Sequence, residues 1–321
     1  MPQPDRAVPR VLVLVATHNG AEFLREQLDS ILSQDDVETH IVVSDDGSTD
    51  GSFDVARDYA SHPEYAARIR LLRPGLFGSA HQNFFRLIRE TEAADFDAIA
   101  LSDQDDIWVA GKLARHYKLL SLPDGIDGHG QYSAISSNVT AFDESGRQQL
   151  VVKNQLQRSH DYAFESGGPG STFLLTPDTY AFVRAQLIAP GSHASRAKSH
   201  DWLIYALVRA SGRRWFIDGE STVSYRQHAD NVLGANEGWR QNAARFAAIA
   251  NGDHRQQVGT IVRACLEVAP PQTSRQLGWL LQRIEQKGPV SRLQLARQVH
   301  RFRRRQRDRL ALAGTILLGI W

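Results

Sequence analysis

The stretch 98–108, AIALSDQDDIW, places three carboxylates within four residues directly after a short apolar run. The apolar run 98–101 is typical of a strand that is buried on both faces. Carboxylates crowded at the end of such a strand repel one another and lose hydration, so a cation or a hydrogen-bonding ligand between them would stabilise them. Oxygen ligands of this kind suit Mg²⁺ or Mn²⁺ bound to a phosphate group. The alternative is a solvated acidic turn that caps the next helix.

The same succession of an apolar run and a polar cluster occurs twice earlier in the chain. The runs 11–16 and 41–43 are rich in valine and isoleucine, and the clusters THNG (17–20) and SDDGSTDGS (44–52) follow them. The hydrophobic spacing predicts strands at 11–16, 41–43, 69–72 and 98–101, and helices at 21–34, 53–60, 83–91 and 112–120. This alternation predicts a parallel, doubly wound sheet, in which ligands bind at the carboxyl ends of the strands. We therefore expect the three polar clusters to converge.

The pattern changes after residue 122. Strands are predicted at 134–142, 172–175, 216–217 and 223–225, and helices at 178–187 and from 199 to 212. From about residue 239 the chain is expected to be helical, with breaks at Pro270-Pro271 and Pro289. We expect a domain over 1–235, with a nucleotide-binding half at about 9–122 and an acceptor half at about 123–235. A helical C-terminal extension with a basic and apolar tail is expected over 236–321.

Composition excludes several classes of protein. The net charge of +1 over 321 residues argues against a nucleic-acid partner for the whole protein. The single cysteine, Cys265, excludes an intramolecular disulfide, and no run of about eighteen apolar residues predicts a spanning helix. Together with an N-terminal segment that lacks a long apolar region, these features favour the cytoplasm. The chain has no GxGxxG after its first strand and no GxxxxGK[ST], which excludes a dinucleotide fingerprint and a P-loop.

Four motifs in order carry a resemblance to a known family. THNG (17–20), SDDGSTDGS (44–52), SDQDDIW (102–108) and SHDW (199–202) resemble the motifs of family 2 glycosyltransferases with the GT-A fold. DQDDIW and YRQHADNVLG (225–234) are similar to signatures of the bacterial rhamnosyltransferase-like branch. The resemblance covers residues 9 to about 235. It implies an α/β fold of GT-A type, in which a Rossmann-like, mostly parallel sheet is flanked by helices, with a C-terminal helical extension.

The resemblance also implies a nucleotide-binding role for the polar clusters. In this family the loop after the first strand touches the base and ribose of the donor, and Asp46 matches the carboxylate that accepts the imide N–H of uracil or thymine. Taken by itself, the cluster DDGSTD is more typical of a turn followed by a helix cap. The nucleotide-binding residues expected from the resemblance are Thr17, His18, Asn19, Asp45, Asp46, Asp103 and Asp105.

The acidic cluster matches the family's DxD-like motif, which implies ribose binding and a divalent metal cofactor, Mg²⁺ or Mn²⁺. The DxD register points to Asp105 as the metal ligand, whereas alignment on the last acid points to Asp106, so both are kept. His228 is a further metal ligand or, alternatively, a loop histidine bonded to its neighbours. Asp201 matches the general base of the family. Its alternative is a helix-start acid, which the unpaired N–H groups of a helix N-terminus favour.

The C-terminal tail joins a basic segment to an apolar one. Residues 300–309 contain six arginines and one aspartate, and residues 310–321 are almost wholly apolar. This pairing suggests peripheral contact of 300–321 with an anionic membrane, at the inner face of the plasma membrane. The alternative is a solvated basic helix followed by a last core or dimer helix.

The activity implied is an inverting glycosyl transfer by metal-assisted single displacement. The donor expected is dTDP-L-rhamnose, and the acceptor is a glycan or lipid-linked glycan of the bacterial envelope or O-antigen type. A UDP-hexose-dependent enzyme of the same family is an alternative. A nucleotidyltransferase would need a Gly-rich basic loop after the first strand, which THNGAEF lacks. A non-catalytic envelope-binding module would have no need of both the acidic cluster and Asp201.

Overall fold

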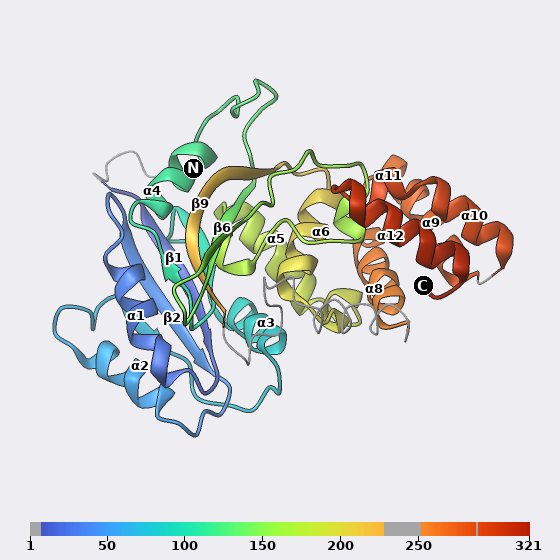
Figure 1. Cartoon of the computed structure of the whole chain (residues 1–321). Helices are drawn as coiled ribbons and strands as arrows, with labels where there is room; N and C mark the ends of the chain where they lie inside the picture. The colour runs from blue at the N-terminus through green and yellow to red at the C-terminus, as the bar shows by residue number, and fades with distance from the viewer. Residues whose placement is uncertain (1–7, 228–251, 287) are drawn as a thin grey trace. The chain divides into compact units, whose positions relative to one another are not determined.

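The computed structural model describes residues 8–227, 252–286 and 288–321 (Figure 1). His228, one of the expected metal ligands, lies outside these residues. The chain forms two compact units. The first consists of Met1–Lys153, Gly168–Ile188 and Arg214–Arg226, and the second of Asn154–Gly167, Ala189–Arg213 and Gln227–Trp321. No helix within the described ranges is both long enough and apolar enough to cross a membrane.

The first unit is built on a sheet with the strand order β3-β2-β1-β4-β8-β6-β9-β5, to which β7 adds by pairing with β6. Its four N-terminal strands pair in parallel: β1 (Arg10–Thr17), β2 (Glu38–Asp45), β3 (Ile69–Leu71) and β4 (Ala98–Ser102). The helices that follow them are α1 (Ala21–Leu32), α2 (Ser52–Ser61), α3 (Ala80–Glu90) and α4 (Lys112–Leu120). The predicted alternation of strands and helices is thus confirmed, and with it the α/β fold class.

The core of the first unit forms where helices cover the sheet. Val11, Val13 and Val15 point to one face of β1, and Leu24 and Leu28 of α1 pack against them, all fully buried. The alternating residues of a strand and the i, i+4 residues of a helix meet in this way because each element presents one apolar face. Full burial of a leucine side chain stabilises the fold by about 1.5–3 kcal/mol. The sheet that carries the polar loops is therefore rigidly held.

The second half of the sheet is antiparallel. It contains β5 (Ile107–Trp108), β6 (Ala134–Asp143), β7 (Gln148–Val151), β8 (Leu174–Leu175) and β9 (Trp215–Gln227), together with η2 (Gly170–Thr172) and α5 (Pro177–Ile188). Sequence analysis did not predict β5 or β7. It also predicted two separate strands, 216–217 and 223–225, where the structure has the single strand β9.

The continuity of β9 depends on a contact that is distant in sequence. Polar residues 218–221 interrupt the apolar pattern of the strand, which made it look like two. Asp218 is buried and accepts hydrogen bonds of 2.6 and 3.0 Å from the guanidinium of Arg115 on α4. Because this partner satisfies the buried carboxylate, the strand continues through a segment that its own composition would end.

The second unit is helical. Its elements are η1 (Asp161–Ala163), η3 (His193–Arg196), α6 (His200–Ala210), α8 (Asp253–Leu266), α9 (Pro271–Glu285), α10 (Pro289–Arg297), α11 (Val299–Phe302) and α12 (Gln306–Leu318). Pro271 and Pro289 begin α9 and α10, where the missing N–H of proline costs no hydrogen bond. The predicted helix breaks at these prolines are therefore present.

The arginines of the tail are mostly bound within the second unit. Arg304 is buried, and its Nε lies 3.4 Å from Glu165 and 3.7 Å from the buried carboxylate of Asp161. Arg303 donates to the carbonyl oxygen of Phe164 at 2.8 Å. Arg301 likewise donates to the hydroxyl of Ser159, and Arg309 donates to the carbonyl oxygens of residues 303 and 304. Arg307 lies 3.7 Å from Asp308. The arginines of the tail thus bind protein groups, which departs from the prediction of a basic segment presented to lipid.

Candidate active site

Three loops begin at one edge of the first unit's sheet. The strand register pairs Thr17 of β1 with Asp45 of β2, and Val15 of β1 with Ser102 of β4. The loops after β1, β2 and β4 therefore start side by side at the carboxyl ends of parallel strands. Open α/β sheets bind their ligands at this edge. The structure brings together the polar clusters at 17–20, 44–52 and 102–106.

Gln104 joins the first and the third of these loops. Its Oε1 accepts hydrogen bonds from Thr17 Oγ1 at 2.8 Å and from the backbone N–H of His18 at 2.7 Å. Its Nε2 donates to the carbonyl oxygen of His18 at 3.0 Å. Sequence analysis named the acids on both sides of Gln104 and passed over the amide between them. The available signal was its position inside the cluster, because an amide can satisfy a backbone N–H and a backbone C=O at once.

His18 and Asn19 join the first loop to the second. His18 donates from Nδ1 to the carbonyl oxygen of Asp46 at 2.7 Å, which fixes the ring orientation. Asn19 adopts a left-handed backbone with φ of 48°, and its Oδ1 accepts from the N–H of Thr49 at 2.9 Å. Its own N–H donates to Ser48 Oγ at 2.9 Å. The side chains expected to touch the donor are therefore held by bonds between the loops.

Asp45 and Asp46 are both buried, and each uses one carboxylate oxygen to shape a loop. Asp45 Oδ1 accepts from the N–H of Ser48 at 2.9 Å. Asp46 Oδ1 accepts from the N–H of Gly78 at 3.2 Å and from that of Phe77. No hydrogen-bond partner of either Oδ2 is found among the residues described. The two acids thus stabilise turns, as in the alternative interpretation of the DDGSTD cluster. One oxygen of each acid remains available to a ligand.

The acids of the third loop differ in exposure. Asp103 and Asp105 are half-buried, whereas Asp106 is only 1% exposed. Asp106 Oδ1 accepts from the backbone N–H of Arg226 at 3.3 Å, and its Oδ2 has no hydrogen-bond partner within the described ranges. Burial, and then the charges of Asp105 and Asp103, raise the pKa of Asp106 well above its ordinary value. Burial and the neighbouring acids therefore oppose ionisation of Asp106.

Arg226 reaches the same loop from the end of β9. The pairing of Trp108 with Val223 brings β9 beside β5, directly after the acids. Arg226 Nε donates to the carbonyl oxygen of Asp105 at 3.0 Å, and its guanidinium lies 4.7 Å from the ring centre of Phe23. Sequence analysis quoted Arg226 within a motif but gave it no role. The structure places a cation beside the three carboxylates and binds it to the backbone of the loop.

A second cation, Lys112, lies behind the loop. Its side chain is buried, and its Nζ is 3.6 Å from the ring centre of Trp108, a cation–π contact. Burial lowers the pKa of Lys112 to about 7, and the charge of Asp106 opposes this shift. Trp108 is itself buried, so it packs in the core rather than facing a sugar.

The residues of the third loop fit a divalent ion that is held mainly by a diphosphate. Within the described parts of the chain, no three His, Cys, Asp or Glu side chains are arranged as a metal site. Mg²⁺ and Mn²⁺ in nucleotide sites usually take one or two protein carboxylates and complete their coordination with phosphate oxygens and water. The half-buried carboxylates of Asp103 and Asp105 provide oxygen ligands of this kind, and the unpartnered oxygen of Asp106 lies in the same loop.

Asp201 belongs to the second unit, at the start of α6. Ser199 precedes the helix and accepts from the N–H of Trp202 at 3.4 Å. Asp201 Oδ1 accepts from the N–H of Trp202 at 2.7 Å and from the hydroxyl of Ser199. The helix-start role is thus present. No hydrogen-bond partner of Asp201 Oδ2 is found in the described ranges. This oxygen is therefore available to accept a proton, as the predicted role of general base requires.

Comparisons with known proteins agree with this fold. Residues 12–165 match the model of Glycosyl transferase family 2. The dTDP-rhamnosyl transferase RfbG of Shigella flexneri is 33% identical over 309 residues, which cover 96% of this chain and 100% of that protein. The putative glycosyltransferase EpsE of Bacillus subtilis is 29% identical over 138 residues, or 43% of this chain and 46% of that one.

Solved structures show the same fold at low sequence identity. TarS 1–349 of S. aureus in complex with UDP has a TM-score of 0.52 and 12% identity, and the match covers 85% of this chain and 69% of that one. The mannosyltransferase PcManGT of Pyrobaculum calidifontis, in complex with GDP-Man and Mn²⁺, has a TM-score of 0.51 and 17% identity, covering 100% and 88%. The fold and these similarities define a glycosyltransferase of GT-A type. The chain belongs to glycosyl transferase family 2, and it is rhamnosyltransferase-like over nearly its whole length.

Proposed function

We propose that this enzyme transfers L-rhamnose from dTDP-rhamnose to a glycan, or lipid-linked glycan, of the bacterial envelope. The observation that carries the proposal is the 33% identity to a dTDP-rhamnosyl transferase over 96% of the chain. In this proposal, residues 9–122 bind the nucleotide and residues 123–235 contribute to acceptor binding. The loops after β1, β2 and β4 would receive the donor.

The nucleotide would contact the polar groups that the loop bonds leave available. Asp46 Oδ2 is suited to accept the imide N–H of thymine, because its other oxygen is held by the backbone N–H groups of residues 77 and 78. Thr17, His18 and Asn19 would line the base and ribose. Uracil carries the same imide N–H, so these contacts accommodate UDP as well as dTDP.

We assign the metal to Asp105, together with Asp103. Asp106 is nearly inaccessible, whereas the side chain of Asp105 is half-buried. When bound, a divalent ion would neutralise the charge that develops on the diphosphate as the bond to the sugar breaks. Arg226, which is paired with Glu26, would hold the backbone of the same loop in place.

Inversion requires a base that takes the proton of the acceptor hydroxyl. In a single displacement the acceptor oxygen bonds to the anomeric carbon, the bond from that carbon to the diphosphate oxygen breaks, and dTDP leaves. Asp201 fits the task because one of its oxygens is fixed by the start of α6 and the other is available to accept the proton. General-base assistance is typically worth about 10²–10⁴ in rate.

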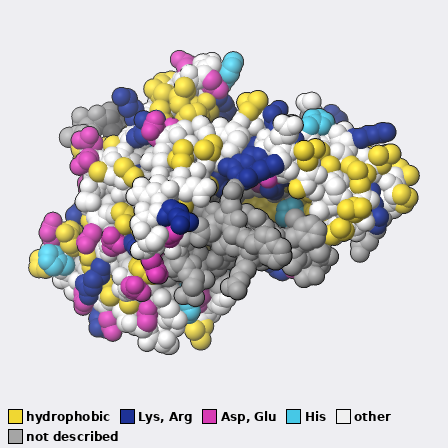
Figure 2. Space-filling model, in the orientation of Figure 1, with side chains coloured by type: hydrophobic (Ala, Val, Ile, Leu, Met, Phe, Trp, Pro, Cys, Tyr) yellow, Lys and Arg dark blue, Asp and Glu magenta, His cyan; other side chains and the backbone are white. Residues whose placement is uncertain are grey.

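We also propose that the second unit contacts the inner face of the plasma membrane through an apolar surface. Leu310, Leu317 and Leu318 of α12 are 69%, 53% and 73% exposed, and Val290 and Leu293 of α10 are 67% and 46% exposed. We call these five residues the α10–α12 patch, and Figure 2 shows hydrophobic side chains gathered over the C-terminal helices. Since most tail arginines bind protein groups, the contact would rest on apolar insertion more than on arginine charge.

Calorimetric titration with dTDP, UDP and GDP, with and without Mn²⁺, tests the proposed donor. We expect dTDP to bind most tightly and its affinity to rise with Mn²⁺. A clear preference for UDP would favour a UDP-hexose-dependent enzyme instead. The absence of metal-dependent binding for all three nucleotides would contradict the proposed site.

A further inference from the structure

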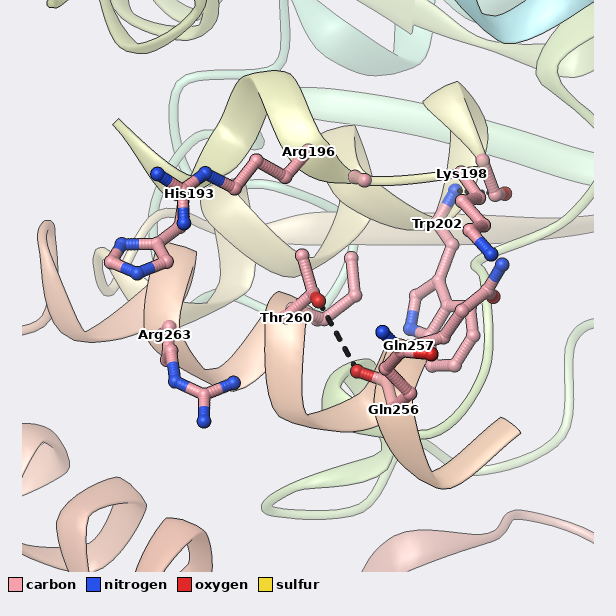
Figure 3. Close-up of a pocket in the computed structure, with 11 residues that line it drawn as sticks. His193, Arg196, Lys198, Trp202, Gln256, Gln257, Thr260 and Arg263 are labelled. Atoms are coloured by element: carbon pink, nitrogen blue, oxygen red, sulfur yellow. Dashed lines mark hydrogen bonds between the residues drawn. The ribbon is translucent and has the colours of Figure 1, made fainter. Parts of the chain in front are cut away.

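A cavity of about 310 Å³ lies in the second unit, beside the start of α6. One wall is a face of α8 formed by Gln256, Thr260 and Arg263, which follow one another at helical spacing. The opposite wall comes from η3 and the segment that leads into α6, with Arg196, Lys198 and Trp202 (Figure 3). Its volume is at the lower end of the range for small-molecule sites.

The lining is positively charged and contains no carboxylate. Arg263 is paired with Glu285 at 2.6 Å, and His193 is bonded to Glu267 at 2.6 Å, so these two groups have partners outside the lining. Arg196 and Lys198 are exposed, and no ion pair of either is found among the residues described. Cations that have no counter-charge among the described residues and lie beside a concave surface create a field that attracts an anion.

Neutral donors complete the lining. The side-chain amides of Gln256 and Gln257 have no hydrogen-bond partners within the described parts of the chain. The hydroxyl of Thr260 donates to the carbonyl oxygen of Gln256 at 3.2 Å, so the donors toward the cavity are the two amides. Amide N–H groups next to Arg and Lys are the donors that phosphate oxygens accept from in proteins.

The cavity adjoins the predicted general base. Ser199 and Trp202 line it, and these are the residues whose hydroxyl and N–H hold Asp201 Oδ1. A ligand in the cavity would therefore lie against the same helix start as the carboxylate that is proposed to deprotonate the acceptor.

We propose that this cavity binds a phosphate or diphosphate group carried by the acceptor. The inference rests on the proposed function, since it presumes an acceptor whose hydroxyl reaches Asp201. Lys198 binds the phosphate oxygens, and the amides of Gln256 and Gln257 beside it add neutral hydrogen bonds. Arg196 extends toward His193 at the other end of the cavity and adds to its positive field (Figure 3). A phosphorylated glycan and a glycan on a lipid diphosphate share this chemistry.

The test is a calorimetric titration of the full chain with inorganic diphosphate and with farnesyl diphosphate, in EDTA so that metal-dependent binding at the donor site does not contribute. The variant is Arg196→Gln/Lys198→Gln. The matched control is Arg297→Gln, which alters an exposed arginine of α10 outside the cavity. We expect both probes to bind the parent, the double variant to lose at least about tenfold in affinity, and the control to bind like the parent. Added salt should weaken binding.

The outcomes separate the two proposals. Failure of the parent to bind either probe, or equal binding by the double variant, overturns the cavity assignment. Binding of inorganic diphosphate without binding of farnesyl diphosphate also overturns it, because the site would then not accept an esterified acceptor. Titration of the same variants with dTDP and Mn²⁺ reports on the donor site alone. If the parent does not bind dTDP in the presence of Mn²⁺, the proposed function is contradicted, whereas the assignment of the cavity is not.

Discussion

The hydroxyl of Thr17 donates a hydrogen bond of 2.8 Å to Oε1 of Gln104, which ties the loop after β1 to the acidic loop after β4. The same amide is bonded twice to the backbone of His18. A loop held at three points loses less conformational entropy when a nucleotide binds, so the bonds should increase donor affinity.

Gln104→Ala removes all three bonds and should weaken dTDP binding by about tenfold or more, since each neutral hydrogen bond contributes about 1 kcal/mol. Folding should change little, because Gln104 is half-buried on a loop. Calorimetry with dTDP and Mn²⁺ measures the effect. Gln149→Ala, an exposed glutamine of β7, serves as the control. Equal dTDP affinity for Gln104→Ala and the parent would show that the bonds do not organise the donor site.

Asp105 and Asp106 should respond differently to replacement by asparagine. Asp105→Asn removes the proposed metal ligand and should lower metal-dependent nucleotide affinity at least about tenfold. Asp106→Asn replaces an acid that is almost inaccessible to a ligand, so the effect on nucleotide binding should be small. The measurement is nucleotide titration at several Mn²⁺ concentrations. If both variants require the same Mn²⁺ concentration as the parent, neither residue binds the metal.

Stability should fall as the pH is lowered from about 6.5 to 4. Burial, followed by the charge of Arg303, lowers the pKa of His254 to about 4, and Nδ1 of this histidine accepts a 2.7 Å hydrogen bond from Trp321 Nε1. In this pH range the unfolded chain binds the proton and the folded chain does not, so the free energy of unfolding decreases, by up to about 3 kcal/mol for this group.

Urea unfolding at pH 7 and pH 4.5 measures this dependence. His254→Gln keeps an acceptor for Trp321 and cannot titrate, so the variant should lose part of the pH dependence of the parent. Replacement of the exposed His62 by Gln is the control. His160, whose pKa burial also lowers to about 4, should account for part of the remainder. A His254→Gln profile parallel to that of the parent would contradict the assignment.

The α10–α12 patch should govern membrane contact. Replacement of Leu310, Leu317 and Leu318 by Asn should abolish co-flotation with anionic liposomes while the fold is retained, because all three side chains are more than half exposed. Leu156→Asn changes a leucine that is 73% exposed elsewhere in the second unit and should float like the parent. A parent protein that never floats, or a triple variant that floats equally, would exclude the membrane proposal.

The sequence predicts the first half of the sheet well because its signals are local. Apolar runs at 11–16 and 41–43, followed by turn formers, define buried strands, and the helix predicted at 112–120 coincides with α4. Because the carboxyl ends of parallel strands lie at the same edge of a sheet, the three polar clusters are expected to lie together, and the register of β1 with β2 and β4 confirms this.

The features that sequence analysis missed depend on contacts between distant residues. β9 looks interrupted because Asp218 finds its partner, Arg115, over a hundred residues away. From the sequence alone the arginines of the tail have no visible partners, because the partners of Arg304, which are Asp161 and Glu165, lie far away in the sequence. The role of Gln104 could not be predicted for the same reason, since its hydrogen-bond partners, Thr17 and His18, are more than eighty residues away in the sequence.

Turnover of dTDP-rhamnose by the parent and by Asp201→Asn tests the central claim most directly. The assay measures release of dTDP, with water as the acceptor when no glycan is added. The parent should release dTDP in a Mn²⁺-dependent manner, and Asp201→Asn should be at least about a hundredfold slower with nearly unchanged dTDP affinity. Asp253→Asn, which removes the first-turn acid of α8, should turn over like the parent. A folded Asp201→Asn enzyme with near-parental turnover, or a parent that releases nucleotide only from a UDP-hexose, would contradict the account.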